Sequence, residues 1–452
     1  MNDNTMTRQE LRTTWGLGLV FSLRMLGMFM VLPVLTTYGM ALQGANETLI
    51  GIAIGIYGLM QALFQIPLGL ISDRIGRKPL IISGLFIFAL GSIIAALSQS
   101  IWGIILGRAL QGAGAIAAVL MALLADLTRE QHRTKAMAFI GVSFGITFAI
   151  AMVLGPIITN AFGLKTLFWM IAVFACGGIL LILLVVPTPK NPILNRETSM
   201  VRGSFGKVLS NTRLLRLNFS IMCLHILLMA NFVALPWLLE HAGLATSQHW
   251  KIYLVTMLIA FACVVPAIIY AEKQRKMKQV MMFCVAMLLC AELLLALSGV
   301  QLPLIIAGVL LFFVAFNILE AILPSLISKE SPAGYKGTAL GVYSTCQFAG
   351  VAIGASVGGW LYGSQGTMTM FLIGALVVSS WFIIVSTMQH PPYVSSLRID
   401  LSARTRHETH LTERIMALAG VTEVVIVASE AAAYIKVDTQ QTSRHQLEQI
   451  LQ

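Results

Sequence analysis

Twelve long apolar stretches set the strictest limit on how this chain of 452 residues can fold. Each stretch reaches at least 18 residues, the length that a helix needs to cross about 30 Å of hydrocarbon. Hydrophobic residues make up 57% of the chain, and the mean hydropathy is +0.84, more than a soluble core of this size requires. Because a spanning segment must satisfy its own backbone hydrogen bonds, we predict an all-α membrane protein.

The predicted spans form two sets of six, separated by one long polar connection. They cover residues 15–39, 50–72, 79–97, 102–125, 136–158 and 164–186, and then 216–239, 250–271, 279–299, 302–327, 337–362 and 367–388. The predicted domains are an N-terminal six-helix half (1–186), a linker (187–215), a C-terminal six-helix half (216–388), a short linker (389–395) and a C-terminal domain (396–452).

Positive charge is distributed very unevenly between the loops. Loops 73–78, 126–135, 187–216, 272–278 and 328–336 carry three, three, six, four and two Lys or Arg residues. The opposite loops carry only Lys165, with Lys251 at a span edge. Positive loops stay in the cytoplasm, so we predict that both termini are cytoplasmic.

The charge balance and the cysteines argue against several functions. The net charge of +11 belongs to the membrane part, because residues 389–452 hold six basic and seven acidic residues. We therefore expect contact with anionic lipid headgroups and not with nucleic acid. All six cysteines lie inside predicted spans without CxxC spacing, so neither a disulfide nor a thiolate metal site is expected.

An internal repeat relates the two halves. Residues 133–138 (RTKAMA) resemble residues 336–341 (KGTALG), and Gly155 and Gly358 follow at the same offset of 203 residues. Parallel six-helix repeats are the usual basis for rocking around a central site.

Residues 396–452 show the alternating patterns of a small cytoplasmic domain. Two consecutive prolines, Pro391 and Pro392, end the last span. Strands at 397–401, 421–427 and 434–437 and helices at 407–419 and 443–451 predict a ferredoxin-like β-α-β-β-α layer. The domain resembles heavy-metal-associated domains, but residues 402–406 (SARTR) stand where those domains carry a cysteine pair, so cysteine-mediated metal carriage is not expected. A regulatory or assembly role and a purely stabilising role remain open.

A dense charged turn, Gly69-x-x-Ser72-Asp73-Arg74-x-Gly76-Arg77-Lys78, separates the second and third spans. Its glycines allow close helix approach and a tight turn, Asp73 can cap a helix N-terminus, and Arg77 can reach a carboxylate on a neighbouring helix. Asp126, at the inner end of the fourth span, is the best candidate partner. The predicted latch residues are Gly69, Asp73, Arg74, Gly76, Arg77, Lys78, Asp126 and Arg133.

This loop, together with Arg108-x-x-Gln111-Gly112-x-Gly114-Ala115 in the fourth span, resembles the signatures of the major facilitator superfamily of transporters. The likeness extends over residues 15–388. It implies a two-half fold in a bacterial inner membrane, no enzymatic activity and no cofactor. It also implies that the latch holds the outward-facing state together and loosens in the inward-facing state. A simple topology anchor is the alternative role for the loop.

Ionisable residues inside spans are functional candidates, and five occur here: Arg24, Arg108, His225, Glu292 and Glu320. Glu320 is the leading candidate for proton exchange, against the alternative of a buried carboxyl that braces two helices. Arg108 could snorkel toward the outer face. The resemblance links it to proton transfer, and a structural pairing near the outer face is the alternative. His225 is either a relay or a packing residue, and Glu292 is a weaker candidate.

A polar line of Tyr57, Gln61 and Gln65 follows one face of the second span at i, i+4 and i+8, which suits a cavity wall better than lipid. Arg24 lies near mid-depth, where it could bind an anion. The predicted cavity residues are Arg24, Tyr57, Gln61, Gln65, Gln111 and Asn317.

These features predict a monomeric secondary transporter that exports small, amphipathic compounds in exchange for protons. A partial antiporter motif around Gly155 and Pro156 favours export. Two alternatives remain: a proton symporter that imports a metabolite, and a membrane sensor that does not transport and uses the C-terminal domain as its output.

Overall fold

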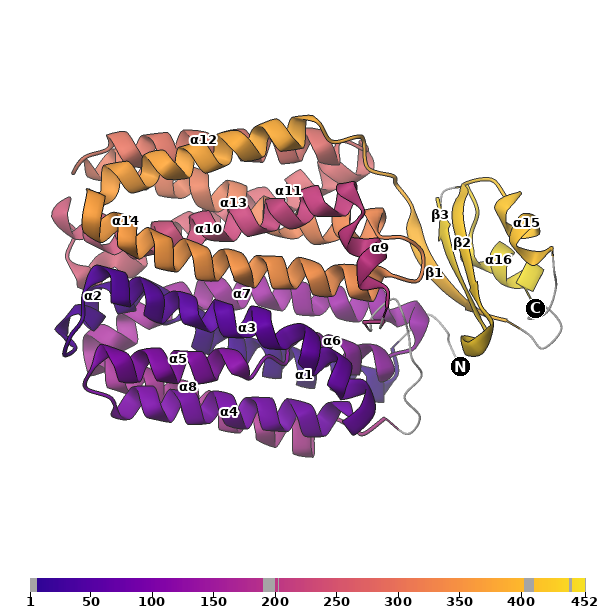
Figure 1. Ribbon diagram of the computed structural model, residues 1–452, viewed down its shortest axis with the longest axis horizontal. Coiled ribbons are helices and arrows are strands. Elements are labelled where there is room, and N and C mark those ends of the chain that lie inside the picture. The colour runs from indigo at the N-terminus through magenta and orange to yellow at the C-terminus, as the bar shows by residue number, and fades with distance from the viewer. Residues whose placement is uncertain (1–5, 190–199, 202, 402–409, 439–440, 452) are drawn as a thin grey trace.

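The computed structural model describes residues 6–189, 200–201, 203–401, 410–438 and 441–451. Long helices lie side by side in one bundle, and a small α+β domain lies beyond one end of it (Figure 1). We call this end of the bundle the domain end and the opposite end the far end.

The N-terminal half of the bundle contains the first eight helices. They are α1 (Arg8–Phe29), α2 (Leu32–Tyr38), α3 (Glu47–Ile75), α4 (Arg77–Leu97), α5 (Ile101–Ala113), α6 (Ala117–Asp126), α7 (Glu130–Phe162) and α8 (Leu164–Leu184), with a short turn η1 (Gly39–Ala41) after α2. The first span comprises α1 and α2, and the fourth comprises α5 and α6.

The C-terminal half repeats this arrangement. Its elements are α9 (Phe205–Leu209), α10 (Thr212–His241), η2 (Thr246–Gln248), α11 (His249–Lys273), α12 (Met277–Leu297), α13 (Leu302–Glu330) and α14 (Lys336–Ser386). Eleven helical stretches in the described residues are long and apolar enough to cross a bilayer. One of them, α14, is broken at Gly366, where φ is 81° and ψ is 175°, so it forms two arms that meet at the far end. With α14 counted as two, the described helices match the twelve predicted spans.

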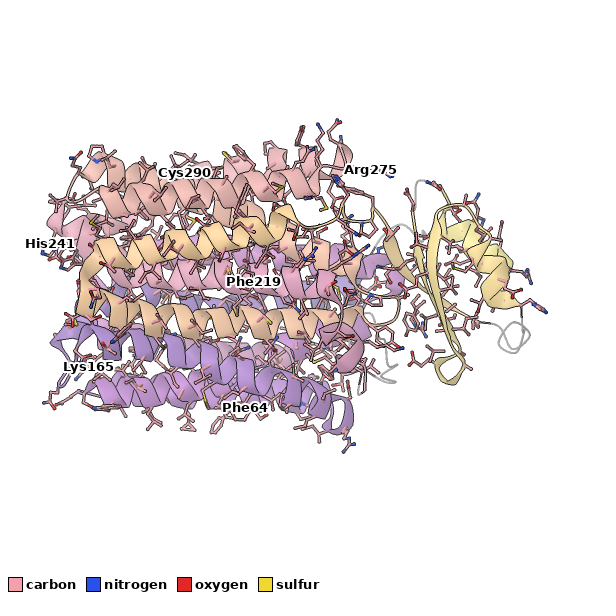
Figure 2. The ribbon with its side chains drawn as sticks, turned by 45° about the horizontal axis from the view of Figure 1, so that its top comes forward. Phe64, Lys165, Phe219, His241, Arg275 and Cys290 are labelled. Atoms are coloured by element: carbon pink, nitrogen blue, oxygen red, sulfur yellow. The ribbon has the colours of Figure 1, made fainter. Side chains whose placement is uncertain are left out.

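Apolar side chains cover the flanks of the bundle, as expected where lipid is the solvent. Figure 2 shows Phe64 and Cys290 on this outer surface, and both are exposed. The labelled polar residues lie at the two ends instead, with Lys165 and His241 at the far end and Arg275 at the domain end.

Two spans are interrupted within the bundle. The first breaks at Met30 and Val31, and Pro33 lies in the first turn of α2, where its missing N–H costs nothing. The fourth breaks at residues 114–116, between α5 and α6. At Gly112, just before this break, a β-carbon would collide with the backbone of Tyr57 on α3. The α5–α6 break therefore lies where two helices touch backbone to backbone.

The two halves meet along α3 and the first arm of α14, which lie side by side (Figure 1). Toward the far end Gly51 of α3 contacts Gly359 of α14, and a side chain at either position would push the helices apart. Toward the domain end, the side chain of Met200 lies between Gly69 and Gly341. The helices are thus in backbone contact at the far end and are separated by a side chain at the domain end.

The C-terminal domain is an antiparallel sheet with the strand order β1-β3-β2 and two helices on one face. Its elements are β1 (Ser395–Asp400), α15 (Leu411–Met416), β2 (Val421–Val427), η4 (Ala428–Glu430), β3 (Ala432–Val437) and α16 (Arg444–Leu451). The predicted β-α-β-β-α order and the ferredoxin-like α+β class are confirmed. Helix α15 is shorter than the predicted helix at 407–419, and residues 402–409, including the segment 402–406, lie outside the described residues.

The central strand β3 is buried on both faces, and this explains how the domain is held. Ala433, Ile435 and Val437 contribute to a core with α15 and α16. The alternating residues face the bundle: Ala432 and Tyr434 pack against Ala333, which has no exposed surface.

Polar contacts complete this interface with the C-terminal half. Lys436 Nζ donates to the backbone oxygen of Lys329 at 2.5 Å, and the Ala333 N–H donates to Glu423 Oε2 at 3.0 Å. Arg275, in the loop after α11, forms an ion pair of 3.0 Å with Asp438. The domain therefore contacts the α11–α12 and α13–α14 loops of the same half.

Replacing Ala333 by Arg is expected to release the domain, because the new side chain has no space beside Tyr434. Limited proteolysis of the linker 389–395 should then become about tenfold faster, since local opening sets its rate. Ala333→Ser is the matched control and should be cleaved at the native rate. Equal cleavage of the native and Ala333→Arg proteins would contradict the docked arrangement.

Candidate functional site

Arg77 is the centre of the predicted latch. Its guanidinium forms ion pairs with Asp126 Oδ2 at 2.6 Å and Asp73 Oδ1 at 2.9 Å, and it donates to Ser72 Oγ at 2.9 Å. The predicted contact with Asp126 is therefore present, and it joins the start of α4 to the end of α6. Such charge-assisted hydrogen bonds are among the strongest available to a protein.

The local backbone explains how Arg77 reaches these partners. Helices α3 and α4 are separated by Gly76 alone, whose φ of 92° is accessible to glycine but strained for other residues. The expected helix cap by Asp73 is not seen at α4, which begins without a side-chain cap. Asp73 instead lies in the last turn of α3, where the i, i+4 spacing places its carboxylate beside Arg77.

The other predicted latch residues occupy different positions around this centre. Lys78 Nζ donates to the backbone oxygen of Val186 at 2.7 Å and so ties α4 to the end of α8. Arg74 is exposed, whereas Gly69 contacts Met200. The side chain of Arg133 lies outside the described part of the structure.

A second ion pair near the latch was not predicted from the sequence. Arg129, just before α7, pairs with Glu10 near the start of α1 at 3.0 Å. Glu10 also accepts from the backbone N–H of Thr7 in a capping box at the start of α1. The domain end of the N-terminal half is therefore held by two separate ionic contacts.

Replacing Arg77 by Gln should destabilise the protein by about 3 kcal/mol, because the buried Asp126 side chain would lose a charged hydrogen-bond partner. The exposed neighbour provides a matched control: Arg74→Gln should change stability by less than about 0.5 kcal/mol. The measurement is reversible unfolding of the purified protein in mixed detergent micelles. Similar midpoints for the two variants would show that the Arg77 cluster contributes little to stability.

Arg108 lies inside the N-terminal half and is only 1% exposed. Its Nη1 donates to Gln111 Oε1 at 2.8 Å, and its guanidinium lies 4.8 Å from the ring centre of Tyr57. Gln111 in turn donates to Ser92 on α4 at 2.8 Å. Arg108 therefore does not reach the membrane surface, because its side chain turns inward to protein groups.

Arg24 is equally buried, and it connects the polar line on α3 to the break in the fourth span. Its Nη2 donates to Gln61 Oε1 at 2.7 Å and to the Gly114 oxygen at 3.2 Å. Gln61 donates to Gln65 Oε1 at 3.4 Å, so two members of the predicted polar line contact each other. The predicted cavity residues Arg24, Gln61 and Gln65 thus form one hydrogen-bonded group.

Glu320 belongs to a second polar cluster, in the C-terminal half. Gln347 Nε2 on α14 lies 3.0 Å from both Glu320 Oε1 and His225 Nε2. His225, on α10, is 3.9 Å from the other carboxylate oxygen of Glu320. Three helices therefore contribute to one group, and Gln347 is the member that was missed from the sequence.

Aromatic contacts place both clusters at the boundary between the halves. Phe316 lies one turn before Glu320 on α13, and its ring centre is 5.9 Å from the ring centre of Phe148 on α7, in the other half. The ring centres of Tyr57 on α3 and Phe348, the neighbour of Gln347 on α14, are 6.5 Å apart. The Arg108–Tyr57 pair and the Glu320 cluster therefore lie next to the surfaces where the halves meet.

The remaining candidates have more local contacts. Asn317 donates to the Phe313 oxygen of its own helix at 2.8 Å and to Met257 Sδ at 3.8 Å. Glu292, with no exposed surface, accepts from Asn231 at 2.7 Å between α12 and α10. This buried pair lies within the C-terminal half, which agrees with the low rank of Glu292 as a transport residue.

Family comparison agrees with the geometry. A model of the Major Facilitator Superfamily matches residues 17–355, and a model of the YajR YAM domain matches residues 397–452. The chain therefore belongs to the Major Facilitator Superfamily of membrane transporters.

Individual transporters are similar to this chain over most of its length. Inner membrane transport protein YajR of Escherichia coli (strain K12) is 65% identical over 451 residues, covering 100% of this chain and 99% of that protein. Multidrug resistance protein MdtH of Aeromonas salmonicida (strain A449) is 24% identical, covering 85% of this chain and 98% of that protein. A crystal structure of the nucleoside transporter NupG has the same fold, with a TM-score of 0.66 at 14% identity over 83% of this chain and 99% of that one.

Proposed function

We propose that this transporter exports small, amphipathic compounds in exchange for protons, by alternating access between its two halves. The observation that supports it best is the Glu320–Gln347–His225 cluster, which lies inside the bundle beside the opposite half.

Glu320 is suited to carry the proton. Its side chain is 18% exposed, and its Oε2 atom has no hydrogen-bond partner among the described residues. A carboxylate oxygen left unpaired in a dry site is stabilised by binding a proton. Gln347 Nε2 can donate a hydrogen bond to the charged carboxylate and lose this bond when Glu320 binds a proton. His225 lies 3.9 Å from the same carboxylate, so its contact with Glu320 can change at the same step.

The arrangement of the halves supports alternating access. Backbone contact at the far end, with Met200 between the helices at the domain end, is what a transporter closed on one side requires. The positive loops lie at the domain end, so we assign that end to the cytoplasm of a bacterial inner membrane. The state described is then closed toward the outside, and the latch would reach across to the other half after the halves rock.

Export is favoured over import by two observations. MdtH, which is similar over most of the chain, is named a multidrug resistance protein. The second is the partial antiporter motif around Gly155 and Pro156. Gly155 of α7 lies against the backbone of Met30, where the first span is interrupted, so this motif contacts the break in the first span directly.

The test uses inside-out membrane vesicles acidified by respiration, with a fluorescent pH probe and a panel of amphipathic compounds. A transported compound should release protons from native vesicles, and Glu320→Gln should slow this release at least about tenfold because the proton carrier is gone. Glu413→Gln, an identical change at an exposed position of the C-terminal domain, should behave as the native protein.

The other results would refute parts of the proposal. Normal proton release by Glu320→Gln would remove Glu320 from the coupling mechanism. Proton movement in the same direction as the compound would indicate symport. Substrate uptake that is independent of the pH gradient in native vesicles would exclude proton coupling.

A further inference from the structure

Two cations are buried in the N-terminal half without a carboxylate partner at their depth. Arg24 and Arg108 are each 1% exposed. The acidic residues between positions 6 and 186 are Glu10, Glu47, Asp73, Asp126 and Glu130, and every one lies at a helix end. Among the described pairs, Glu10 holds Arg129, while Asp73 and Asp126 hold Arg77. The charge of the two inner arginines is therefore not neutralised by this half.

The two arginines differ in how many of their N–H donors lack a hydrogen-bond partner. Arg108 uses Nη1 and Nε toward Gln111 and Ala53, and it also stacks over Tyr57. Arg24 lies 5.7 Å from the ring centre of Phe88, but it donates hydrogen bonds only through Nη2, and its Nε and Nη1 atoms have no hydrogen-bond partner among the described residues. A buried guanidinium with unused donors is costly unless something else accepts from them. Arg24 is therefore the one with capacity to hold a ligand.

The break in the fourth span places two helix ends near Arg24. The Gly114 oxygen, at the C-terminus of α5, accepts from Arg24 Nη2 and so occupies that nitrogen. Helix α6 begins three residues later, at Ala117, without a side-chain cap, so its first N–H groups carry the positive end of the α6 dipole. In transporters, half-helix N-termini inside the membrane are used to hold anionic groups.

The site is close to the surface that opens when the halves separate. Gln61, the partner of Arg24, is one turn from Tyr57 on α3, and Tyr57 contacts Phe348 of the other half. Separation of α3 from α14 would bring this face of α3 into contact with the central space. A ligand that enters between the halves would thus meet Gln61 and Arg24.

We infer that Arg24 and the N-terminus of α6 bind the anionic group of the transported compound, so the substrates are small organic anions carrying a carboxylate, sulfonate or phosphate. This inference rests on the proposed transport function and names its substrate class. Guanidinium groups bind such planar or tetrahedral oxyanions through several N–H donors at once. The anion supplies the negative charge that the N-terminal half lacks.

The test measures binding to the purified full-length protein, so it does not depend on proton coupling. Three pairs of fluorescent probes compare an anion with a neutral compound on the same ring system: naphthoate and naphthamide, naphthalenesulfonate and its sulfonamide, naphthyl phosphate and naphthol. We expect at least one anion to bind at least about tenfold more tightly than its neutral partner.

Variants identify the residue responsible. Arg24→Gln should weaken that anion about tenfold or more while the neutral probe is unaffected, and Arg24→Lys should restore part of the affinity because it keeps the charge. Lys165→Gln removes one positive charge from the far end of the same half and should bind normally.

Two outcomes would overturn the inference. The first is that no anion in the panel binds more tightly than its neutral partner. The second is that Arg24→Gln, with native elution and helical content, keeps the native affinity. Proton release by native vesicles in the previous experiment would then leave the transport proposal intact without the anionic substrate class.

Discussion

No water is available inside a bilayer to pair with a polar side chain, so each such group must be satisfied by protein or by a ligand. Arg108 meets this constraint through Gln111, Ala53 and Tyr57. Other buried polar atoms have no hydrogen-bond partner among the described residues, and they include Glu292 Oε2, Glu320 Oε2 and two nitrogens of Arg24. Of these groups, Arg24 and Glu320 are the two for which we propose a partner from outside, because their clusters lie beside the surface where the halves meet.

The two halves share one fold but differ in the charge that they bury. The N-terminal half buries arginines, and the C-terminal half holds the fully buried Glu292 and the partly buried Glu320. The two halves therefore differ in charge although a repeat at an offset of 203 residues relates them. Under the proposed function, the N-terminal half would bind an anion and the C-terminal half a proton, at different sites. Exchange of one for the other then needs no shared residue, only one rocking motion that exposes both sites.

The fold was largely predictable because it depends on length and composition. Hydropathy located the spans. Asp126 and Arg77 were both expected on the cytoplasmic side of the membrane, and this was enough to predict their contact. Contacts inside the membrane were harder to predict, because they depend on helix rotation. Gln347 is a neutral residue in a span of small and apolar residues, and its role follows only from α13 and α10 lying beside it. The inward turn of Arg108 and the break at residues 114–116 similarly depend on the close packing of Gly112 against α3.

The position of the C-terminal domain links it to the Glu320–Gln347–His225 cluster. The domain packs on Ala333 in the loop that joins α13 and α14, the two helices that carry Glu320 and Gln347. It also holds Arg275 in the loop before α12, and all these contacts belong to one half. Through these contacts between described residues, the domain is attached to the C-terminal half. It can therefore influence transport by restraining the relative positions of α13 and α14, because a small shift between these helices changes the 3.0 Å contact of Gln347 with Glu320.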